Sequence, residues 1–333
     1  MSTLTTLIPA YRSDYLAELF LGLKTQTFQD FRVVLSDDSP DGSITDLFRR
    51  GHFDALIDRL DVVVVPGPRH GCFKNIHHLL ARWGAISPLV HLHMDDDVIY
   101  PDFYRMHVLT HGSATLGASV SQRWLGSAEG RPVAMLPLPE LVAQQPQRVL
   151  AIDGRTIFDT TIPLCCNWLG EFSNCVLAQP AVQRLRIAKI GDLSYYGLGD
   201  VGALIDVAQE LPIGFLQDHL SVFRSHPGQR TAQRASHGLQ CGYLAWVALA
   251  LGAQAVGAVS AAQASQAVSR TVRLCMQHYA DDPVFVEFFA LVKANGEQGA
   301  ALHAAFGCYW RRLLQTNPDS CERAGQSAQL AAA

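Results

Sequence analysis

Short apolar segments alternate with amphipathic helical segments through the first part of this chain. Residues 4–10 (LTTLIPA) and 31–36 (FRVVLS) are apolar, partly β-branched runs that end at turn residues, and residues 14–27 between them have apolar side chains at helical spacing. The pattern continues with segments that predict a helix, a strand, a helix and a strand over 46–60, 62–65, 74–83 and 89–94. Strand–helix–strand units join parallel strands through right-handed crossovers. The order therefore predicts an α/β fold, an open and mostly parallel sheet of Rossmann type with helices on both faces.

The later part of the chain changes character twice. Residues 113–162 are mixed, and strand or helix signals then return over 171–176, 181–187 and 201–208. Beyond Arg230 only helical patterns remain, up to Leu314. The sequence therefore predicts an α/β domain over 1–230, an α-helical C-terminal region over 231–321 with its boundary near Thr231, and a disordered Ala-rich tail over 322–333.

Composition and targeting signals exclude several classes of protein. The chain has 26 Lys and Arg against 30 Asp and Glu, a net charge of −4, which argues against a nucleic-acid partner held by a basic surface. Its eight cysteines include no CxxC pair, which argues against a zinc ribbon or a disulfide framework. The N-terminus, MSTLTTLIPAYRSDY, lacks the features of a signal peptide, so we expect a cytoplasmic protein.

One uncharged segment has the length of a membrane span. Residues 243–262 (YLAWVALALGAQAVGAVSAA) contain no charged side chain, but they are rich in Ala and Gly and include Gln254. We predict a buried helix here, with a helix on or across a membrane as the alternative.

Three adjacent carboxylates follow the predicted strand over 89–94. Asp95, Asp96 and Asp97 would repel one another, and a hard divalent cation relieves such repulsion. On an extended segment Asp95 and Asp97 would point to the same side and Asp96 to the other. The alternative is an acidic turn that caps the following helix. In an open sheet, ligands bind beyond the carboxyl ends of the strands, where this cluster and the residues after the first two strands fall.

Two nearby histidines invite a metal interpretation. His91 and His93 alternate on one face of a predicted strand, a spacing that permits ligation, but no third ligand has a suggestive spacing. Structural histidines are the favoured interpretation, and a role near the site or a zinc site are the alternatives.

The opening segment resembles that of family 2 glycosyltransferases. The family has a strand ending in P-x-Y/F-N, a helix ending in Q-T-F/Y and a strand ending in V-D-D-x-S-x-D-G, and this chain has TTLIPAYRSDYLAELFLGLKTQTFQDFRVVLSDDSPDGS. Arg12 and Ser36 depart mildly from that pattern. Asp95–Asp97 match the acidic metal motif of the family, but Met94 stands where the first aspartate often is, which leaves open which carboxylate is the main metal ligand.

Three later segments resemble further motifs of the same family, in the same order. Residues 167–173 (NWLGEFS) are similar to the segment that faces the acceptor, and Gly197-Leu-Gly-Asp200 is similar to the segment whose aspartate is the general base. Residues 223–229 (FRSHPGQ) are similar to the segment that closes over the donor diphosphate. The resemblance implies a GT-A-like fold over 1–230, with a nucleotide-sugar half over about 1–105 and an acceptor half over about 106–230.

The resemblance, together with positions at strand ends, assigns the site residues. The expected catalytic residues are Asp200, as general base, and its competitor Glu171. The expected metal ligands for Mn²⁺ or Mg²⁺ are Asp95, Asp97 and His226. The expected donor-binding residues are Pro9, Tyr11, Asp37, Asp38, Lys74, Asp95 and Asp96. For Asp37 and Asp38 the alternative is a pair of turn or capping aspartates, for Lys74 a solvated surface position, and for His226 a loop histidine in a Pro-Gly turn.

The implied activity is metal-dependent, inverting transfer of a sugar from a UDP-, GDP- or dTDP-linked donor to an alcohol. The acceptor would be a saccharide, a lipid-linked molecule or a protein, in bacterial surface polysaccharide, lipopolysaccharide or protein glycan assembly. A nucleotidyltransferase and a non-catalytic carbohydrate-binding or scaffold protein are the alternatives. The oligomeric state stays open, as does peripheral contact with the inner face of a membrane.

Overall fold

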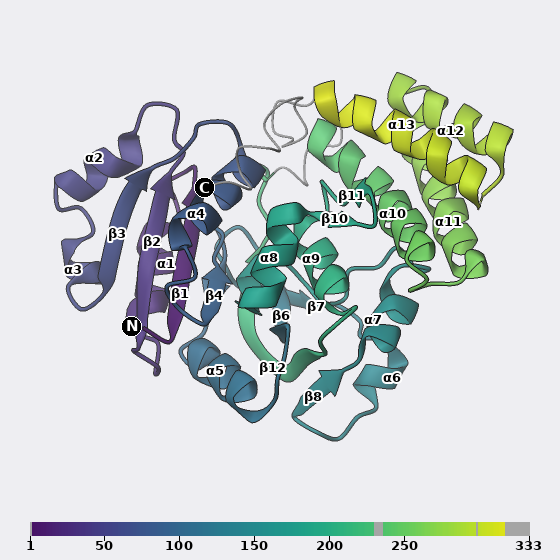
Figure 1. The fold of residues 1–333 in the computed structure, drawn as a ribbon. Coiled ribbons are helices and arrows are strands. Elements are labelled where there is room, and N and C mark those ends of the chain that lie inside the picture. Colours follow the sequence, from purple (N-terminus) through teal and green to yellow (C-terminus); the bar gives the residue numbers. More distant parts are fainter. Residues whose placement is uncertain (1, 230–235, 298, 317–333) are drawn as a thin grey trace. The chain divides into compact units, whose positions relative to one another are not determined.

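The computed structural model describes residues 2–229, 236–297 and 299–316 (Figure 1). These residues form two compact units, each assembled from separate chain segments. Unit 1 comprises the residues up to Asp153, Trp168–Arg186 and Glu210–His226, and unit 2 comprises Gly154–Asn167, Ile187–Gln209 and the described residues from Pro227 onward. The predicted boundary near Thr231 and the predicted tail over 322–333 lie outside the described residues.

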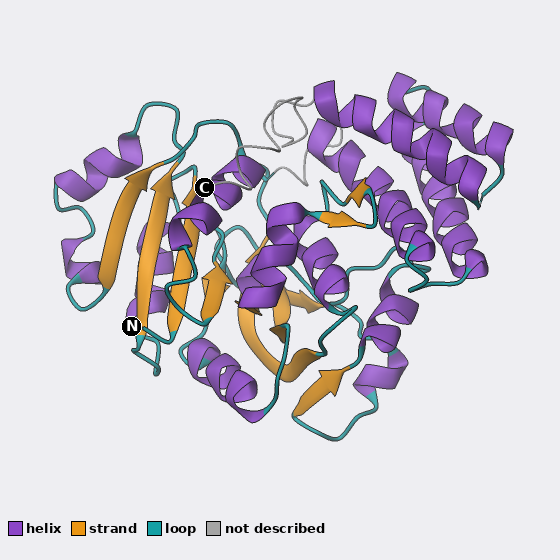
Figure 2. Ribbon diagram, viewed as in Figure 1, coloured by secondary structure: helices purple, strands orange, loops and turns teal. Residues whose placement is uncertain are grey.

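Ten strands of the described chain form one mixed sheet in unit 1 (Figure 2). They are β1 Leu4–Ala10, β2 Phe31–Asp37, β3 Asp61–Pro66, β4 Leu89–Leu92, β5 Val98–Ile99, β6 Ala118–Gly126, β7 Pro132–Met135, β8 Val149–Ile152, β9 Cys175–Ala178 and β12 Ile213–Arg224. The order is β3-β2-β1-β4-β9-β6-β12-β5, with β7 beside β6 and β8 beside β12. Strands β3, β2, β1 and β4 are parallel neighbours, as are β6 and β12, and the remaining pairs are antiparallel. The predicted open α/β sheet is confirmed.

The helices of unit 1 follow the predicted alternation with one difference. They are α1 Leu16–Lys24, α2 Ser43–Arg49, α3 Asp54–Ile57, α4 Cys72–Trp83, α5 Phe103–Ser113, α6 Glu140–Ala143, the 3₁₀ helix η1 Phe172–Asn174 and α8 Gln179–Ile187. The single helix expected over 46–60 is two short helices. Gly51 separates them because its φ of 73° lies in the left-handed region, which ends a helix.

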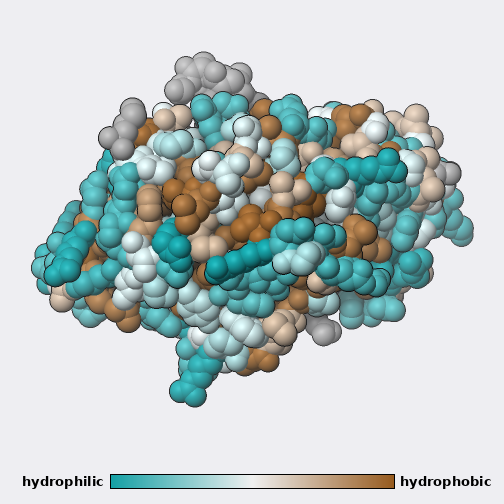
Figure 3. Space-filling view, turned by 90° about the horizontal axis from the view of Figure 1, so that it is seen from below, coloured by the Kyte–Doolittle hydropathy of each residue, from teal (hydrophilic) through white to brown (hydrophobic). Residues whose placement is uncertain are grey.

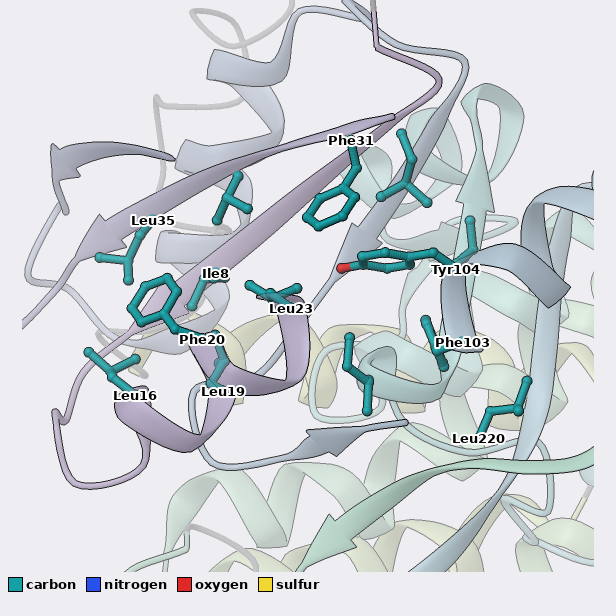
Figure 4. Close-up of a cluster of buried hydrophobic side chains, with 14 of the residues drawn as sticks. Ile8, Leu16, Leu19, Phe20, Leu23, Phe31, Leu35, Phe103, Tyr104 and Leu220 are labelled. Carbon is teal, nitrogen blue, oxygen red and sulfur yellow. The ribbon is translucent and has the colours of Figure 1, made fainter. Parts of the chain in front are cut away.

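The first strands are buried on both faces. Leu16, Leu19, Phe20 and Leu23 of α1 pack with Ile8 of β1 and other side chains on one face (Figure 4). On the opposite face the Ser36 hydroxyl of β2 bonds to the amide oxygen of α4's Asn75, at 2.5 Å. Burying each large aliphatic or aromatic side chain contributes about 1.5–3 kcal/mol, so this core fixes the sheet firmly.

The strand order reverses beside β1. The chain runs from β1 outward to β2 and β3 and then returns to place β4 on the other side of β1. At such a switch point the loops after the two central strands diverge and leave room for a ligand at the carboxyl edge. The residues after β1 and β4 are Tyr11 and Arg12, and the run from His93 to Asp97.

Unit 2 is mainly helical. Its elements are α7 Gly154–Thr161, the two-stranded pair β10 Lys189–Ile190 and β11 Leu193–Ser194, α9 Gly199–Val207, α10 His237–Ala255, α11 Ala261–Tyr279, α12 Pro283–Asn295 and α13 Ala300–Thr316. Helix α10 is buried along most of its length, which confirms the buried helix predicted from residue 243, although it ends at Ala255. A new helix begins after Ser260, whose hydroxyl accepts a hydrogen bond from the Gln263 N–H.

Apolar side chains are not confined to the interior. Within the described residues, no helix combines the length and the apolar character needed to cross a bilayer. Exposed apolar side chains of unit 1 include Val133, Met135 and Leu141, and Figure 3 shows apolar patches among hydrophilic side chains on one face of the molecule.

We expect the substitution Trp310→Ala to destabilise unit 2 by about 3–5 kcal/mol, the usual cost of removing a buried Trp side chain. Trp310 of α13 is 1% exposed, stacks on Phe306 and donates its indole N–H to the Ser194 carbonyl of β11 at 2.8 Å. Denaturant unfolding measures the change. Met276→Ala is the control, because Met276 is 55% exposed on α11, and an equal loss in both variants would contradict the packing described here.

Candidate functional site

The Asp95 carboxylate joins the ends of the two central strands. Its Oδ2 accepts hydrogen bonds from the backbone N–H groups of Tyr11 and Arg12, at 2.7 and 3.0 Å. Burial raises the pKa of Asp95 to about 6, and the neighbouring charge of Asp96 adds to this, while the two N–H groups oppose it. The loop after β1 is thus tied to the first residue of the acidic cluster.

The acidic cluster is a turn and not an extended segment. The Asp97 N–H donates to the Met94 carbonyl at 3.4 Å, and Asp95 and Asp96 lie inside that turn. The expectation that Asp95 and Asp97 share one side by strand alternation is therefore wrong, because alternation requires extended backbone. Each of the three carboxylates instead has its own set of partners.

Asp96 meets the histidine that follows the last long strand. The Asp96 Oδ2 lies 3.0 Å from the His226 Nε2, and the two side chains are 21% and 8% exposed. The His226 ring also contacts the Tyr15 ring, with 5.3 Å between centroids. A carboxylate oxygen and an imidazole nitrogen, both common metal ligands, therefore meet at the edge of the sheet.

Asp97 is the most deeply buried of the three. Its side chain is 2% exposed, and its Oδ1 accepts the backbone N–H of Arg224 at 3.0 Å. Its Oδ2 is buried and makes no hydrogen bond of good geometry among the described residues, although the Ser173 hydroxyl lies close enough to stabilise the carboxylate. Burial raises the pKa of Asp97 well above its usual value, helped by the charge of Asp96 and opposed by the Ser173 hydroxyl and the Arg224 N–H.

Asp37 was expected to bind the donor, but its carboxylate accepts hydrogen bonds from residues of its own loop. Its Oδ1 accepts from the N–H and hydroxyl of Ser39, and its Oδ2 from the N–H and hydroxyl of Thr45. Burial alone would raise the pKa of Asp37, but these four bonds lower it below its usual value. Asp37 therefore shapes the turn after β2, in line with the capping alternative.

The other donor residues take different positions around the same edge. Asp38 accepts the backbone N–H of Arg69. Tyr11 is 52% exposed, Lys74 is half-buried in the first turn of α4, and Pro9 is buried inside β1, opposite Ser36. Tyr11 and Lys74 thus have side-chain surface to offer a ligand, whereas Pro9 contributes to the strand.

The expected acceptor-side residues fall in different units. Glu171 in unit 1 precedes η1 and pairs with the buried Arg123 of β6, whose Nη2 lies 2.8 Å from its Oε1. Asp200 in unit 2 lies in the first turn of α9, where its Oδ1 accepts the N–H of Val201 at 2.7 Å. The roles given to Asp200 and Glu171 stay predictions.

The two strand histidines are buried and neutral. The Nδ1 of His91 lies 3.0 Å from the Tyr104 hydroxyl and its Nε2 lies 3.1 Å from the Ser173 carbonyl, so both ring nitrogens are already engaged. Burial lowers the pKa of His91 well below its usual value, and that of His93 to about 3. The two rings stack on each other with 5.0 Å between centroids, but both ring nitrogens of His93 are buried without a hydrogen bond among the described residues, so the interpretation as a satisfied structural histidine holds for His91 alone.

Two arginines of this site had no role assigned from the sequence, although Arg224 lies in the segment 223–229 that was matched to the donor motif. Arg123 and Arg224 lie in strands that are otherwise largely apolar, β6 and β12, and both are buried against carboxylates. An arginine inside an apolar run is itself a signal, because a buried cation needs a partner. The sequence does not say which carboxylate that partner is.

Sequence comparisons find no relative for this chain. A scan against protein-family models gives no match, and neither does a search of curated proteins.

Solved structures with the same fold exist. The crystal structure of Staphylococcus aureus TarS 1–349 in complex with UDP-GlcNAc matches 95% of this chain and 82% of its own length, with a TM-score of 0.57 and 13% sequence identity. A longer TarS structure matches 97% of this chain with a TM-score of 0.58 and 14% identity, and this chain spans 55% of it. The likeness establishes the fold, which is the GT-A-like fold expected from the sequence.

We expect Asp37→Ala to lower the free energy of unfolding by at least about 2 kcal/mol at neutral pH, since four hydrogen bonds to one charged group are lost. The lowered pKa means that this contribution is present above pH 3.8 and is lost as pH falls through the folded-state pKa. Denaturant unfolding against pH should show the wild type and the variant converging in acid. Asp281→Ala, which removes an exposed carboxylate between α11 and α12, is the control, and a pH-independent difference between the wild type and Asp37→Ala would contradict this account.

Proposed function

We propose that this chain is a glycosyltransferase that moves a sugar from a nucleotide-sugar donor to an alcohol acceptor. The observation that carries the proposal is the meeting of Asp95, Asp96 and His226 at the switch point of a GT-A-like sheet, at the edge where ligands bind. The likeness to TarS, which was solved with UDP-GlcNAc, supports the same class of donor.

We propose Asp96 and His226 as the protein ligands of a divalent cation, Mn²⁺ or Mg²⁺. Asp96 and His226 offer a carboxylate oxygen and an imidazole nitrogen that lie 3.0 Å apart. The described residues contain no group of three or more His, Cys, Asp or Glu side chains that could hold a metal ion. Cations of this kind often take their remaining ligands from substrate phosphates. When bound, the ion would neutralise the negative charge that develops on the departing diphosphate.

The chain's own residues would orient the donor. The exposed Tyr11 ring follows β1, where it can lie against a base or ribose, and Lys74 in the first turn of α4 can reach a phosphate. Asp95 keeps the loop that carries Tyr11 in place through its two hydrogen bonds to that loop. Asp37 and Asp38 support the neighbouring loop, so their contribution to donor binding is to shape it.

The acceptor hydroxyl needs a base as it attacks. Asp200 is proposed for this step, because a carboxylate that abstracts the proton opposite the leaving group gives inversion at the anomeric carbon. Glu171 is the alternative, but both of its oxygens face the Arg123 guanidinium, so an acceptor hydroxyl would have to compete with that pairing.

The finer assignment rests on the sequence motifs. We include membership of family 2, and a place in bacterial surface polysaccharide, lipopolysaccharide or protein glycan assembly, in this proposal. The acceptor would then be a saccharide, a lipid-linked molecule or a protein, and the proposed location is the cytoplasm, including the inner face of the membrane.

Donor binding should require a divalent cation. We expect one of UDP, GDP or dTDP to bind at least about 10-fold more tightly with Mn²⁺ than with EDTA, because the diphosphate and the acidic turn otherwise repel each other. In Asp96→Asn this gain should largely disappear. Calorimetry with the three nucleotides measures both effects.

The matched control for that experiment is Asp61→Asn, which removes a carboxylate that is 64% exposed in β3. It should bind like the wild type. Equal affinity in Mn²⁺ and in EDTA for all three nucleotides would refute the proposed metal dependence.

The chemical step should depend on Asp200. We expect Asp200→Asn to lower kcat by about 10²- to 10⁴-fold with nearly unchanged donor affinity, the usual effect of removing a positioned base. Transfer rate and nucleotide-sugar affinity are measured together for Asp200→Asn and Glu171→Gln. Normal turnover in Asp200→Asn with loss in Glu171→Gln would exchange the two roles, and activity in both would refute the acceptor-side assignment.

A further inference from the structure

The Arg224 side chain is 1% exposed, which is rare for a cation. Burying a charge is costly unless it is paired and hydrogen-bonded, and here it is both. Its Nε donates to the Asp96 carbonyl at 2.5 Å, its Nη1 to the Ala128 carbonyl at 2.7 Å, and its Nη2 to the Glu18 carboxylate. These interactions turn the guanidinium away from solvent, so it is not placed to meet a donor phosphate.

The guanidinium connects four separate segments of unit 1. Glu18 belongs to α1, Asp96 to the acidic turn, Ala128 to the loop between β6 and β7, and Arg224 itself ends β12. The guanidinium lies over the ring of Tyr15, 4.2 Å from its centroid. The same ring contacts His226, so Tyr15 links the arginine to the proposed metal ligand.

Arg224 also fixes the two acidic residues by separate bonds. Its side chain holds the backbone carbonyl of Asp96, while its own N–H holds the Oδ1 of Asp97. The Asp96 carboxylate itself stays available to His226, two residues beyond Arg224. Arg224 thus holds the backbone of Asp96 and the side chain of Asp97, and it lies at the start of the segment that carries His226.

We propose that Arg224 is a positioning residue that holds Asp96 and His226 at the spacing needed for a divalent cation. The inference rests on the proposed function, and it adds a role for a residue that touches neither donor nor cation. Arginine suits this role because its planar fork donates in several fixed directions, whereas lysine donates from a single point.

A glycine beside Arg224 offers a way to displace the guanidinium without removing it. A Cβ added at Gly130 would lie 3.0 Å from both Nη atoms and 3.1 Å from the Glu18 Oε1. Gly130 has a φ of 73°, so Gly130→Ala adds backbone strain as well as this contact. Gly257→Ala is the matched control, because Gly257 has a φ of 76° and its added Cβ would meet no atom within 4 Å.

The test measures Mn²⁺ affinity by electron paramagnetic resonance, and UDP, GDP and dTDP affinity in Mn²⁺ and in EDTA. The full chain is compared with Arg224→Lys, Gly130→Ala and Gly257→Ala, with thermal unfolding in parallel. We expect Arg224→Lys and Gly130→Ala to lose about 10- to 100-fold in Mn²⁺ affinity, the usual effect of removing a residue that orients a metal ligand. Nucleotide affinity in EDTA should not change, and Gly257→Ala should bind Mn²⁺ like the wild type.

The outcomes separate this inference from the proposed function. Wild-type Mn²⁺ affinity in both Arg224→Lys and folded Gly130→Ala would overturn the positioning role and leave the proposed function standing. A second outcome is that the wild type binds Mn²⁺ but none of the three nucleotides, and that the two variants lose the Mn²⁺ binding. This outcome would support the positioning role and overturn the proposed function. A wild type that binds no Mn²⁺ would overturn both.

Discussion

Two backbone N–H groups after β1 hold the carboxylate of Asp95, and the geometry of the site depends on this contact. It joins the strands on either side of the switch point, so the loop carrying Tyr11 and the acidic turn cannot move independently. The contact offsets part of the cost of burying Asp95, whose pKa nevertheless stays raised. The sheet therefore holds the Asp95 carboxylate in place, and the tight turn that follows determines where Asp96 and Asp97 lie.

Three consecutive carboxylates are tolerated because each is compensated differently. Backbone N–H groups serve Asp95, an imidazole faces Asp96, and a backbone N–H of β12 serves Asp97. The last two partners come from a segment more than a hundred residues further along the chain. Strand β12, which comes last of these strands along the chain, is thus as important to the acidic turn as β4, which precedes the turn. Burial still raises the pKa of Asp97, so compensation of its charge within the described residues is incomplete.

The sequence predicted the parts of the fold that depend on local pattern. Strands β1 and β2, helices α1 and α4, and the acidic residues beyond β4 follow from periodicity and turn residues, because each is determined within a short window. Strand β12 was not predicted: polar residues interrupt its apolar pattern where its pairing with β6 shifts register around His219. Long-range pairings, such as that of Asp96 with His226, could not be predicted from periodicity either, since they depend on the order of the strands in the sheet. The sequence left open whether Asp37 binds a ligand or caps its own loop, and the hydrogen bonds of the structure decide for the loop.

The Arg123–Glu171 pair bears on which carboxylate can act as a base. Both Glu171 oxygens face the buried Arg123 guanidinium, and breaking this pair would leave the arginine charge buried without its partner. Removing either partner should therefore affect the fold near η1 before it affects chemistry. Asp200 lies at the start of α9, where its Oδ1 accepts the backbone N–H of Val201. Donor affinity and transfer rate, measured separately, therefore distinguish a role of either carboxylate in the chemical step from a role in maintaining the fold.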